Sequence, residues 1–441
     1  MRKPRISDLS DLGLPIRLPR PVRLNLAPAV ADGPVRAVIT SKKLAEEFAD
    51  MSGVSSENFP FSTRIFAFPL RQSDEVIVGT ADRALPLVVR RDEDVIVNFD
   101  IWATQEFRFP DSRRPIYTYI PGFNIHAVPE GIRRPISNLV QSLRSPRSLD
   151  VAGSYKRLPL TGFEFILFLL NTILTSGCPQ RPPVFQWPSG KRAVFVSLHD
   201  VDTPGFLRRR QRDPLFRIEA AHQIRSTWFI PTAVLNKHNH AADFILESGN
   251  EVGWHGHEHD HRDHVRPFAD HAVKAFQNSR LGALANSPTG MRLPKLLKSN
   301  YLFERLEQSC PTLCYDTSFL QGIVPYYLWF NGRASRILEI PTTVPTEIRV
   351  YNELRGLSRA RRADAILKIQ IARTQKLLEV GALISIVTHP EKGLSERPEF
   401  LDVYSQYLSF IRSCPGVWFA TAKELFQYWT GEGPCSASRT A

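Results

Sequence analysis

The sequence predicts an α/β protein in which a strand-rich α+β region precedes a parallel barrel or a doubly wound sheet. From Lys191 onward, short apolar runs alternate with helix-like segments about seven times, a rhythm typical of βα units. Acids, histidines and an arginine follow directly after several of these apolar runs. In such folds the chemically active residues sit at the C-terminal ends of the strands, so the same pattern predicts where the functional site lies.

The first part of the chain has a different pattern, which predicts an accessory domain. Residues 1–30 are rich in Pro and Arg and are expected to form a loosely ordered tail. Short Val- and Ile-rich runs over about 35–125 predict strands, with one helix over 41–49, and residues 130–186 are expected to be mainly helical up to a proline cluster. We therefore expect a tail over 1–30, a strand-rich then helical accessory domain of unknown role over 31–186, a second domain over 187–430 and a C-terminal tail over 431–441.

Individual strands and helices of the second domain are predicted from the apolar runs and from the residues that separate them. Strands are expected over 194–198, 226–231, 251–254, 290–292, 313–315, 337–340 and 382–387. Helices are expected over 216–225, 240–248 and 358–380, with Gly249 suited to end the second of them. Before this domain, the most apolar run of the chain covers about a dozen residues over 163–174, whereas a bilayer span needs roughly twenty. It predicts a buried helix, and we expect no transmembrane segment.

The net charge indicates which classes of binding partner to expect. The chain has 441 residues and a formal net charge of +12. Much of the excess lies in arginine clusters at 113–114, 133–134, 208–210 and 359–362, none of which carries the interleaved aromatics of a nucleic-acid module. We therefore expect no specific nucleic-acid partner. Solvated basic faces explain the clusters, with an anionic substrate or surface as the alternative.

Cysteine content and the N-terminal residues bear on the compartment. The chain has five cysteines, which are too few for a secreted disulfide framework of this length, and Cys310 and Cys314 are expected to be unpaired thiols. The N-terminal residues are basic but lack the apolar core of a secretory signal. A cytoplasmic location is therefore expected, and the oligomeric state is left open.

Two acids follow the apolar run 194–198 in the stretch Asp200-Val-Asp202. Residues two apart on a strand face the same side, so both carboxylates are expected to point into one pocket. A metal-dependent hydrolase needs a carboxylate ligand and a base for the attacking water, and two neighbouring acids can divide these tasks. The alternative is a turn or a helix cap, because Asp is common at strand ends.

A histidine-rich stretch follows the apolar run 251–254. If a helical turn starts there, His255 and His259 share a face, which suits a zinc-like ion. If the backbone stays extended, His255, His257, His259 and His261 share a face instead. The simpler alternative is a loop that binds metals only loosely. The apolar run directly before the histidines argues against it.

Three further residues stand where a barrel would place catalytic groups. Arg292 follows Gly290-Met291 and can keep a neighbouring acid ionised and oriented. Asp316 lies at the end of another apolar run, and His389, after the run 382–387, has the chemistry of a general acid. Taken singly, each has an ordinary structural explanation, respectively a surface ion pair, a helix cap and a buried, hydrogen-bonded histidine.

Taken together and in order, these motifs resemble the polysaccharide deacetylase family, the NodB-homology group also called carbohydrate esterase 4. The resemblance covers about 187–430, just over half of the chain. Its motifs are Asp200-Val-Asp202, Glu251-Val-Gly-Trp-His255 to His259, Arg292-Leu-Pro294, Tyr315-Asp316-Thr-Ser318, Thr388-His389-Pro390 and the closing stretch 417–425.

The resemblance implies a distorted (β/α)7 barrel over 187–430 and hydrolysis of an N-acetyl amide on a sugar. By analogy with the family, Asp200 is the catalytic base, Arg292 orients it and His389 protonates the leaving amine. The metal ligands are Asp202, His255 and His259. Zinc suits these ligands, and cobalt, nickel or manganese can also occupy such a set. Substrate contacts are expected from Trp254, Pro294, Lys295 and Asp316.

Departures from the family pattern leave the substrate open. Gly256 stands where the family usually has Ser or Thr, and Lys295 where an aromatic residue often lines the substrate groove. Lys295 and Lys298 are instead suited to an anionic substrate. Beside the carbohydrate deacetylase, two alternatives remain: an amidohydrolase acting on a small or cyclic amide, and a non-catalytic glycan-binding protein that contains a metal.

Overall fold

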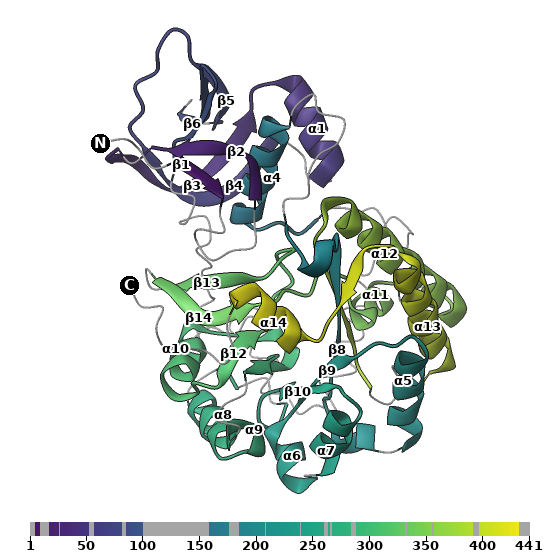
Figure 1. Cartoon of the computed structure of the whole chain (residues 1–441). Helices are drawn as coiled ribbons and strands as arrows, with labels where there is room; N and C mark the ends of the chain where they lie inside the picture. Colours follow the sequence, from purple (N-terminus) through teal and green to yellow (C-terminus); the bar gives the residue numbers. More distant parts are fainter. Residues whose placement is uncertain are drawn as a thin grey trace.

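The structure is a computed structural model of the 441-residue chain. It describes residues 5–8, 17–25, 27–52, 57–81, 85–99, 158–175, 185–207, 209–238, 240–259, 263–264, 267–283, 288–330, 333–354, 357–390 and 397–431. These residues form an α/β protein with a strand-rich sheet near the N-terminus and a distorted barrel in the remainder, as Figure 1 shows. The fold class predicted from the sequence is confirmed.

The N-terminal sheet has seven strands in the order β1-β2-β7-β6-β5-β3-β4. Helix α1 packs against helix α4 across this part, where Phe48 meets Phe165 with ring centroids 5.0 Å apart. Strands β3, β5, β6 and β7 and helix α1 coincide with the Val- and Ile-rich runs and with the single helix that the sequence predicted. The bounds are β1 (Arg5–Asp8), β2 (Arg17–Leu24), β3 (Ala29–Ile39), α1 (Lys42–Ser52), β4 (Glu57–Phe66), β5 (Glu75–Thr80), β6 (Pro86–Arg91), β7 (Asp94–Val97) and α4 (Gly162–Leu174).

Strands β1 and β2 lie within 1–30, where a loosely ordered tail was expected. Strand β2 runs parallel to β7, with Val22 opposite Val95 and Leu24 opposite Val97. The side chain of Val22 is buried in the core. The sequence did not indicate this strand, because its prolines and arginines do not form a strand-like local pattern. Its order comes from pairing with a strand some seventy residues later.

The second sheet supplies the barrel. Its order is β13-β14-β12-β11-β10-β9-β8-β15, with β16 paired to the start of β8, and all neighbours are parallel except β13 and β14. The strands are β8 (Ala193–Asp200), β9 (Ser226–Ile230), β10 (Glu251–Trp254), β11 (Thr289–Met291), β12 (Leu313–Asp316), β13 (Tyr326–Phe330), β14 (Arg333–Glu339), β15 (Leu383–Thr388) and β16 (Val417–Phe419).

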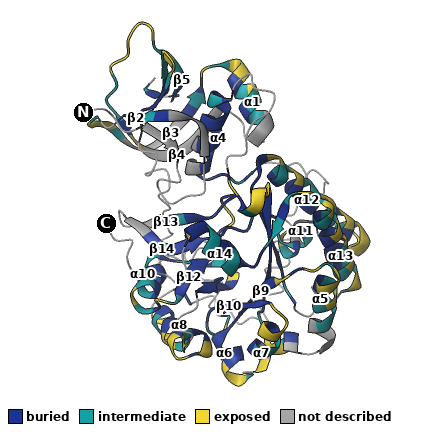
Figure 2. Cartoon of the chain, viewed as in Figure 1, coloured by how far each residue is buried: buried dark blue, intermediate teal, exposed yellow. Residues whose placement is uncertain are grey.

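Most of the helices cover the outside of this sheet, with buried faces toward the strands and exposed faces outward (Figure 2). Helix α14 (Ala422–Thr430) lies against the inner face instead, where the Lys423 N–H donates to Glu251 and the ring of Phe426 stacks on that of Tyr315. The longest, α12, starts at the cap Ser358 and ends at Gly381, whose φ of 71° suits glycine. The helices are α5 (Arg209–Ala221), α6 (Thr232–Lys237), α7 (His240–Glu247), α8 (Phe268–Gln277), α9 (Arg280–Ala283), α10 (Asn300–Ser309), α11 (Glu347–Glu353), α12 (Arg359–Val380), α13 (Pro398–Ser413) and α14 (Ala422–Thr430).

The barrel is distorted where β14 and β15 fail to pair as strands. The segment after β14 bridges this gap instead, because the backbone N–H of Val344 donates to the carbonyl of Ser385 at 3.1 Å. Thr343 reinforces the bridge, since its hydroxyl accepts from the Ser385 N–H and its own N–H donates to the Ser385 hydroxyl. Side-chain hydroxyls thus replace part of a strand ladder, which is a pairing that hydrophobic periodicity does not predict.

The two cysteines expected to be unpaired thiols differ. Cys310 is buried with a free thiol, and burial raises its pKa to about 12, so it stays protonated and unreactive at neutral pH. Cys314 is disulfide-bonded, which corrects the expectation for that residue. Sequence spacing does not show such a bond, because it depends on which side chains the fold brings together.

The N-terminal part meets the barrel at the end where the parallel strands begin. Glu164, in the first turn of α4, accepts hydrogen bonds from the backbone N–H groups of Ile323 and Val324 at 2.6 and 2.9 Å. The Ile323 carbonyl in turn accepts from the N–H of Leu383, the first residue of β15. The contact therefore lies a strand length away from the C-terminal strand ends. Helix α4 is buried as predicted, and no described helix has the length and apolar character that a bilayer crossing requires.

Glu164→Ala is expected to lower the free energy of unfolding by about 2–4 kcal/mol. The substitution leaves three buried backbone N–H groups, those of Thr161, Ile323 and Val324, without their acceptor. Urea unfolding measures the change. Asp364→Ala is the control, because Asp364 makes an exposed ion pair with Lys368 and its loss should change stability by less than about 0.5 kcal/mol. Equal losses for the two variants would contradict the role given to Glu164.

Candidate metal centre and catalytic groups

The predicted site residues come together because of the strand register. Thr388 of β15 lies opposite His199 of β8, so the next residues along each chain, His389 and Asp200, become neighbours. Trp254 of β10 lies opposite Met291 of β11, which in the same way brings together the next residues, His255 and Arg292. The four strands belong to one curved run of the sheet, so all these side chains meet at its C-terminal edge.

Asp202, His255 and His259 form a group that could hold a metal ion. Each offers one ligand atom, and these atoms lie within 4.8 Å of one another. The Asp202 Oδ1 atom is 3.4 Å from His255 Nε2 and 2.9 Å from His259 Nε2. One carboxylate oxygen and two imidazole nitrogens are a donor set that suits zinc and other borderline divalent ions, and it leaves coordination positions open. The residues therefore fit the predicted metal.

Hydrogen bonding fixes which nitrogen His255 presents to this group. Its Nδ1 atom lies 2.7 Å from the backbone carbonyl of Arg292, so Nδ1 carries the proton and donates it. The other nitrogen, Nε2, faces Asp202, and a bound metal ion would take the place of the proton that Nε2 shares with that carboxylate. The residue is buried in the barrel, so its orientation is held on every side.

The turn that carries both histidines is neither of the two forms considered from the sequence. It is not helical, and His259 has a left-handed φ of 55°, uncommon for a residue with a side chain. His257 points elsewhere, with Nδ1 2.9 Å from the Thr232 hydroxyl and its ring against His271. His255 and His259 converge because of these backbone turns, while His261 lies outside the described residues.

Gly256 makes this turn possible, which accounts for one departure from the family pattern. Its φ is 71°, and a Cβ atom there would lie 2.6 Å from Asp263 Oδ2 and 2.6 Å from Pro294 Cγ. Asp263 also accepts the backbone N–H of His257 at 3.0 Å. A Ser or Thr at this position would displace the loop that carries the metal ligands.

Asp200 forms a buried ion pair with Arg292. The Arg292 Nε atom donates to Asp200 Oδ2 at 2.7 Å, and its Nη1 atom donates to the Thr317 carbonyl and to the Thr342 hydroxyl. Burial raises the pKa of Asp200, but the charges of Arg292 and of nearby His255 and His389 outweigh it and hold the pKa below its usual value. Asp200 Oδ1 is buried and has no hydrogen-bond partner among the described residues.

Asp202 differs from Asp200 in its partners and exposure. Burial raises its pKa, but hydrogen bonds from His255 and His259 hold the pKa well below the usual value for Asp. Both acids are therefore ionised at neutral pH, one beside an arginine and the other beside two imidazoles. His199, the residue before Asp200, does not interfere: it is buried and lies 2.6 Å from the Thr388 hydroxyl and 2.8 Å from Glu219.

Sequence analysis missed Glu347, which holds His389. Its Oε1 atom accepts the backbone N–H of His389 at 2.9 Å and lies 3.0 Å from His389 Nδ1. The opposite nitrogen, Nε2, lies 3.7 Å from Asp200 Oδ2. The only signal in the sequence is Thr346, whose side chain caps α11, so a helix start was detectable there but its partner in space was not.

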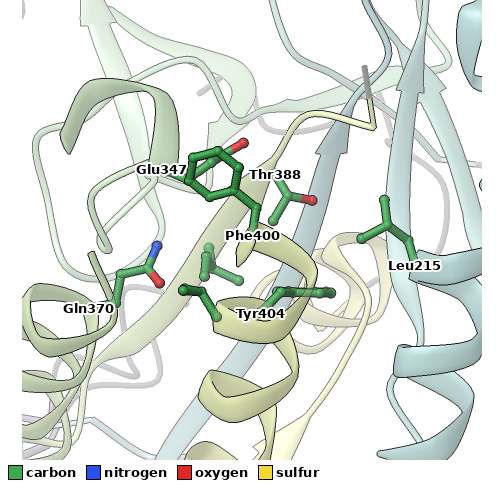
Figure 3. A pocket seen from close by; sticks show the side chains of 8 residues that line it. Leu215, Glu347, Gln370, Thr388, Phe400 and Tyr404 are labelled. Atoms are coloured by element: carbon green, nitrogen blue, oxygen red, sulfur yellow. The ribbon is translucent and has the colours of Figure 1, made fainter. Parts of the chain in front are cut away.

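A small pocket lies behind this pair. Figure 3 shows Glu347 and Thr388 at its upper side, with Gln370, Phe400, Tyr404 and Leu215 around it. Its volume of about 20 Å³ is room for one water molecule. The Glu347 Oε2 atom is buried and has no hydrogen-bond partner among the described residues.

The four predicted substrate contacts divide into two groups. Lys295 is exposed beside Arg292 with a φ of 53°, and Pro294 is buried against Gly256. Trp254 points the other way, because alternation along β10 turns it outward onto Phe276 of α8, and Asp316 is buried and accepts from the Ser318 hydroxyl at 2.5 Å. The expected substrate roles of Trp254 and Asp316 are therefore corrected to packing and internal hydrogen bonding.

Comparison with known proteins gives matches among solved structures only. No protein-family model matches the sequence, and no curated protein does. A putative polysaccharide deacetylase from Mycobacterium smegmatis matches at 18% identity over 59% of this chain and 98% of its own, with a TM-score of 0.45. A probable polysaccharide deacetylase from Pseudomonas aeruginosa PAO1 matches at 14% identity over 59% and 98%, with a TM-score of 0.47. An allantoinase, PuuE, matches at 15% identity over 58% and 96%, with a TM-score of 0.46. This similarity assigns no activity to the chain.

Asp202→Ala and His255→Ala are each expected to reduce bound metal to below about a tenth of the wild-type content, because each removes one of three ligands. Metal per chain after dialysis, measured by elemental analysis, checks this. His257→Gln is the matched control, since His257 points away from the group toward Thr232 and His271. Full metal content in Asp202→Ala, or an equal loss in the control, would contradict the assigned ligand set.

Glu347→Gln is expected to shift the alkaline limb of the pH–activity profile to lower pH. Burial lowers the pKa of His389, but the charge of Glu347, its hydrogen bond and the charges of Asp200 and Asp202 together raise it to about 9. A general acid works below its pKa and is lost as pH rises through it, so removing the Glu347 charge moves this loss downward.

The profile must be compared at equal metal loading, because a bound cation lowers the pKa of His389 in both proteins. An NMR titration of the His389 imidazole in metal-free protein gives the same comparison without turnover. Glu379→Gln serves as the control, since Glu379 is exposed and pairs with Lys376. An unchanged His389 titration in Glu347→Gln would refute the pairing.

Proposed function

We propose that this protein is a metal-dependent hydrolase that removes an N-acetyl group from an amino sugar in a glycan or glycoconjugate. The observation that carries the proposal is the meeting of three groups at one edge of the barrel. They are the ligand set Asp202, His255 and His259, the ion pair of Asp200 with Arg292, and the pair of His389 with Glu347. The carbohydrate substrate is the part that rests on the family resemblance of the motifs.

Asp202, His255 and His259 would hold the divalent cation, for which zinc is the first candidate and cobalt, nickel or manganese the others. When bound, such an ion polarises the carbonyl of the amide and lowers the pKa of a water molecule. The hydrogen bond from His255 Nδ1 to the Arg292 carbonyl keeps that ligand in place before any ion arrives.

Asp200 has the properties of the base that takes a proton from the attacking water. Its carboxylate is ionised at neutral pH, and Arg292 holds Oδ2. The other oxygen, Oδ1, is buried and has no protein partner among the described residues, so it is the atom available to accept the proton. Arg292 thus restricts the carboxylate to one orientation and leaves one oxygen for the reaction.

His389 has the properties of the acid that protonates the leaving nitrogen. Amide hydrolysis needs this step because an amine anion is a poor leaving group. Glu347 holds Nδ1 and raises the proton affinity of the ring, and Nε2 lies 3.7 Å from Asp200 on the reacting side. The base and the acid are therefore neighbours in the site.

A small or cyclic amide is the second candidate substrate. It is favoured by one observation, that the exposed Lys295 occupies the position where an aromatic residue often lines the groove for a sugar polymer. The non-catalytic alternative is disfavoured by the arrangement of the acid and the base, since each is held by its own partner: Arg292 for Asp200 and Glu347 for His389.

Turnover assays separate these possibilities. N-acetylglucosamine oligomers are expected to be deacetylated, with acetate release, faster than hydantoin-like cyclic amides are opened. Asp200→Asn is expected to reduce kcat by about 10²–10⁴ while keeping the bound metal, because it removes the base and none of the ligands. Hydrolysis of only the cyclic amides would replace the sugar substrate with the second candidate. A metal-loaded protein that turns over neither class would overturn the proposal.

A further inference from the structure

Tyr351 on α11 is held between two arginines. The guanidinium carbon of Arg362 lies 4.4 Å from the centroid of its ring, and that of Arg397 lies 5.4 Å away. Arg397 Nη1 also donates to the Tyr351 hydroxyl at 2.7 Å. The two positive charges therefore lie within about 10 Å of each other, close enough to repel through physiological salt.

This cluster stands beside the proposed reaction centre. Tyr351 follows Glu347 by four residues on α11, so the two side chains share one face of the helix, about 6 Å apart at Cβ. Glu347 is the residue that holds His389.

Further positive charge lies at the same edge of the barrel. Helix α12 leads down into β15, so its first turn is at the edge where His389 ends β15, and that turn carries Arg359 and Arg361. Both are exposed and make no ion pair with a described acid, nor does Arg397. Asp364 on the same helix already pairs with Lys368. Glu399, near Arg397, is the acid that partly offsets these charges.

The helix dipole does not explain this placement. Arginines in the first turn of a helix face the positive end of its dipole, where acids are favoured, and α12 has no acid in its first turn. Arg397 is the N-cap residue of α13, so its charge also lies at the start of a helix. Arginines gathered at such places are suited to an anion, which they bind through paired N–H donors.

Of the two lysines that the sequence indicated for an anionic substrate, Lys298 is engaged within the fold. It donates to the carbonyls of Ser318 and Leu296 and lies over the ring of Phe319 at 3.9 Å. It also faces the buried acids Asp316 and Glu339. Beside the exposed Lys295, positive charge for a substrate is supplied by Arg397 and Arg359.

We infer that this cluster, comprising Tyr351, Arg359, Arg362 and Arg397, binds a negatively charged group on the glycan substrate. The ligand is an oxyanion, either the carboxylate of a uronic acid or a phosphate ester. The inference rests on the proposed function for its position in the reaction, but the preference for an anion is measurable by binding alone.

The test compares matched ligands at low salt. The probes are a neutral N-acetylglucosamine tetramer, the same tetramer bearing one phosphate ester, and a tetramer that alternates N-acetylglucosamine with glucuronic acid. Isothermal titration uses the metal-loaded Asp200→Asn protein, and KM and kcat are measured in the protein with Asp200 intact. The variants are Arg397→Gln and Arg359→Gln. Arg280→Gln on α9, which removes the same charge from an exposed pair with Asp243, is the control.

An anionic probe is expected to bind about tenfold more tightly than the neutral one, and the preference should fall as salt rises. Both variants should bind that probe about tenfold more weakly and show a KM for it about tenfold higher. Their kcat and their binding of the neutral probe should be unchanged, and the control should change in neither affinity nor KM. Preference for only one of the anionic probes identifies the phosphate or the carboxylate as the ligand.

Equal binding of neutral and anionic probes, or an equal loss in Arg280→Gln, would overturn the inference. The circular dichroism spectrum and Tm of each variant establish that it is folded. Selective anion binding that the variants abolish, with no deacetylation of any probe, would support the anion site and overturn the proposed function. Deacetylation without any preference for an anionic probe would support the proposed function and overturn the anion site.

Discussion

Arg292 joins the two halves of the candidate site. Its side chain donates to Asp200, and its backbone carbonyl accepts the proton of His255. The guanidinium is buried, so it must be paired, because an unpaired buried charge is strongly destabilising. The Thr317 carbonyl and the Thr342 hydroxyl satisfy its remaining contacts and set its direction. The base and a metal ligand are therefore fixed relative to one residue, and the distances across the site follow from its position.

Four acids of this protein, Glu164, Glu251, Asp200 and Asp202, fall into two classes according to their neighbours. Burial favours the neutral form of each, and it raises the pKa of Glu164 and of Glu251 to about 7. Asp200 and Asp202 are the exceptions, because an arginine and imidazoles lie against them and their pKa values are lowered. Structural acids are thus bonded mainly to backbone N–H and hydroxyl groups, and the candidate catalytic acids to cations.

The barrel keeps stability and chemistry at opposite ends. Glu164 secures the N-terminal part to Ile323 and Val324, beside the start of β15, whereas His389 follows the end of the same strand. Parallel strands all present their C-terminal ends at one edge, where their backbone pairing stops and side chains can converge. The arginine cluster around Tyr351 lies at that edge because α12 runs antiparallel to β15. Charge that would weaken a helix start is thereby placed at the edge where we infer that an anionic group binds.

The sequence by itself determined the alternation of strands and helices and the positions of Asp200, Asp202, His255, Arg292 and His389 at strand ends, which follow from local periodicity. Periodicity left a barrel and a doubly wound sheet open, and only the resemblance of the ordered motifs to a family implied the barrel. The tertiary structure decided the rest. It showed that Glu347 holds His389, that β2 joins a sheet through β7, and that Trp254 and Asp316 serve in packing and internal hydrogen bonding. Each of these depends on contacts between residues far apart in the chain, or on which face of a strand meets a helix, and neither leaves a pattern in neighbouring residues.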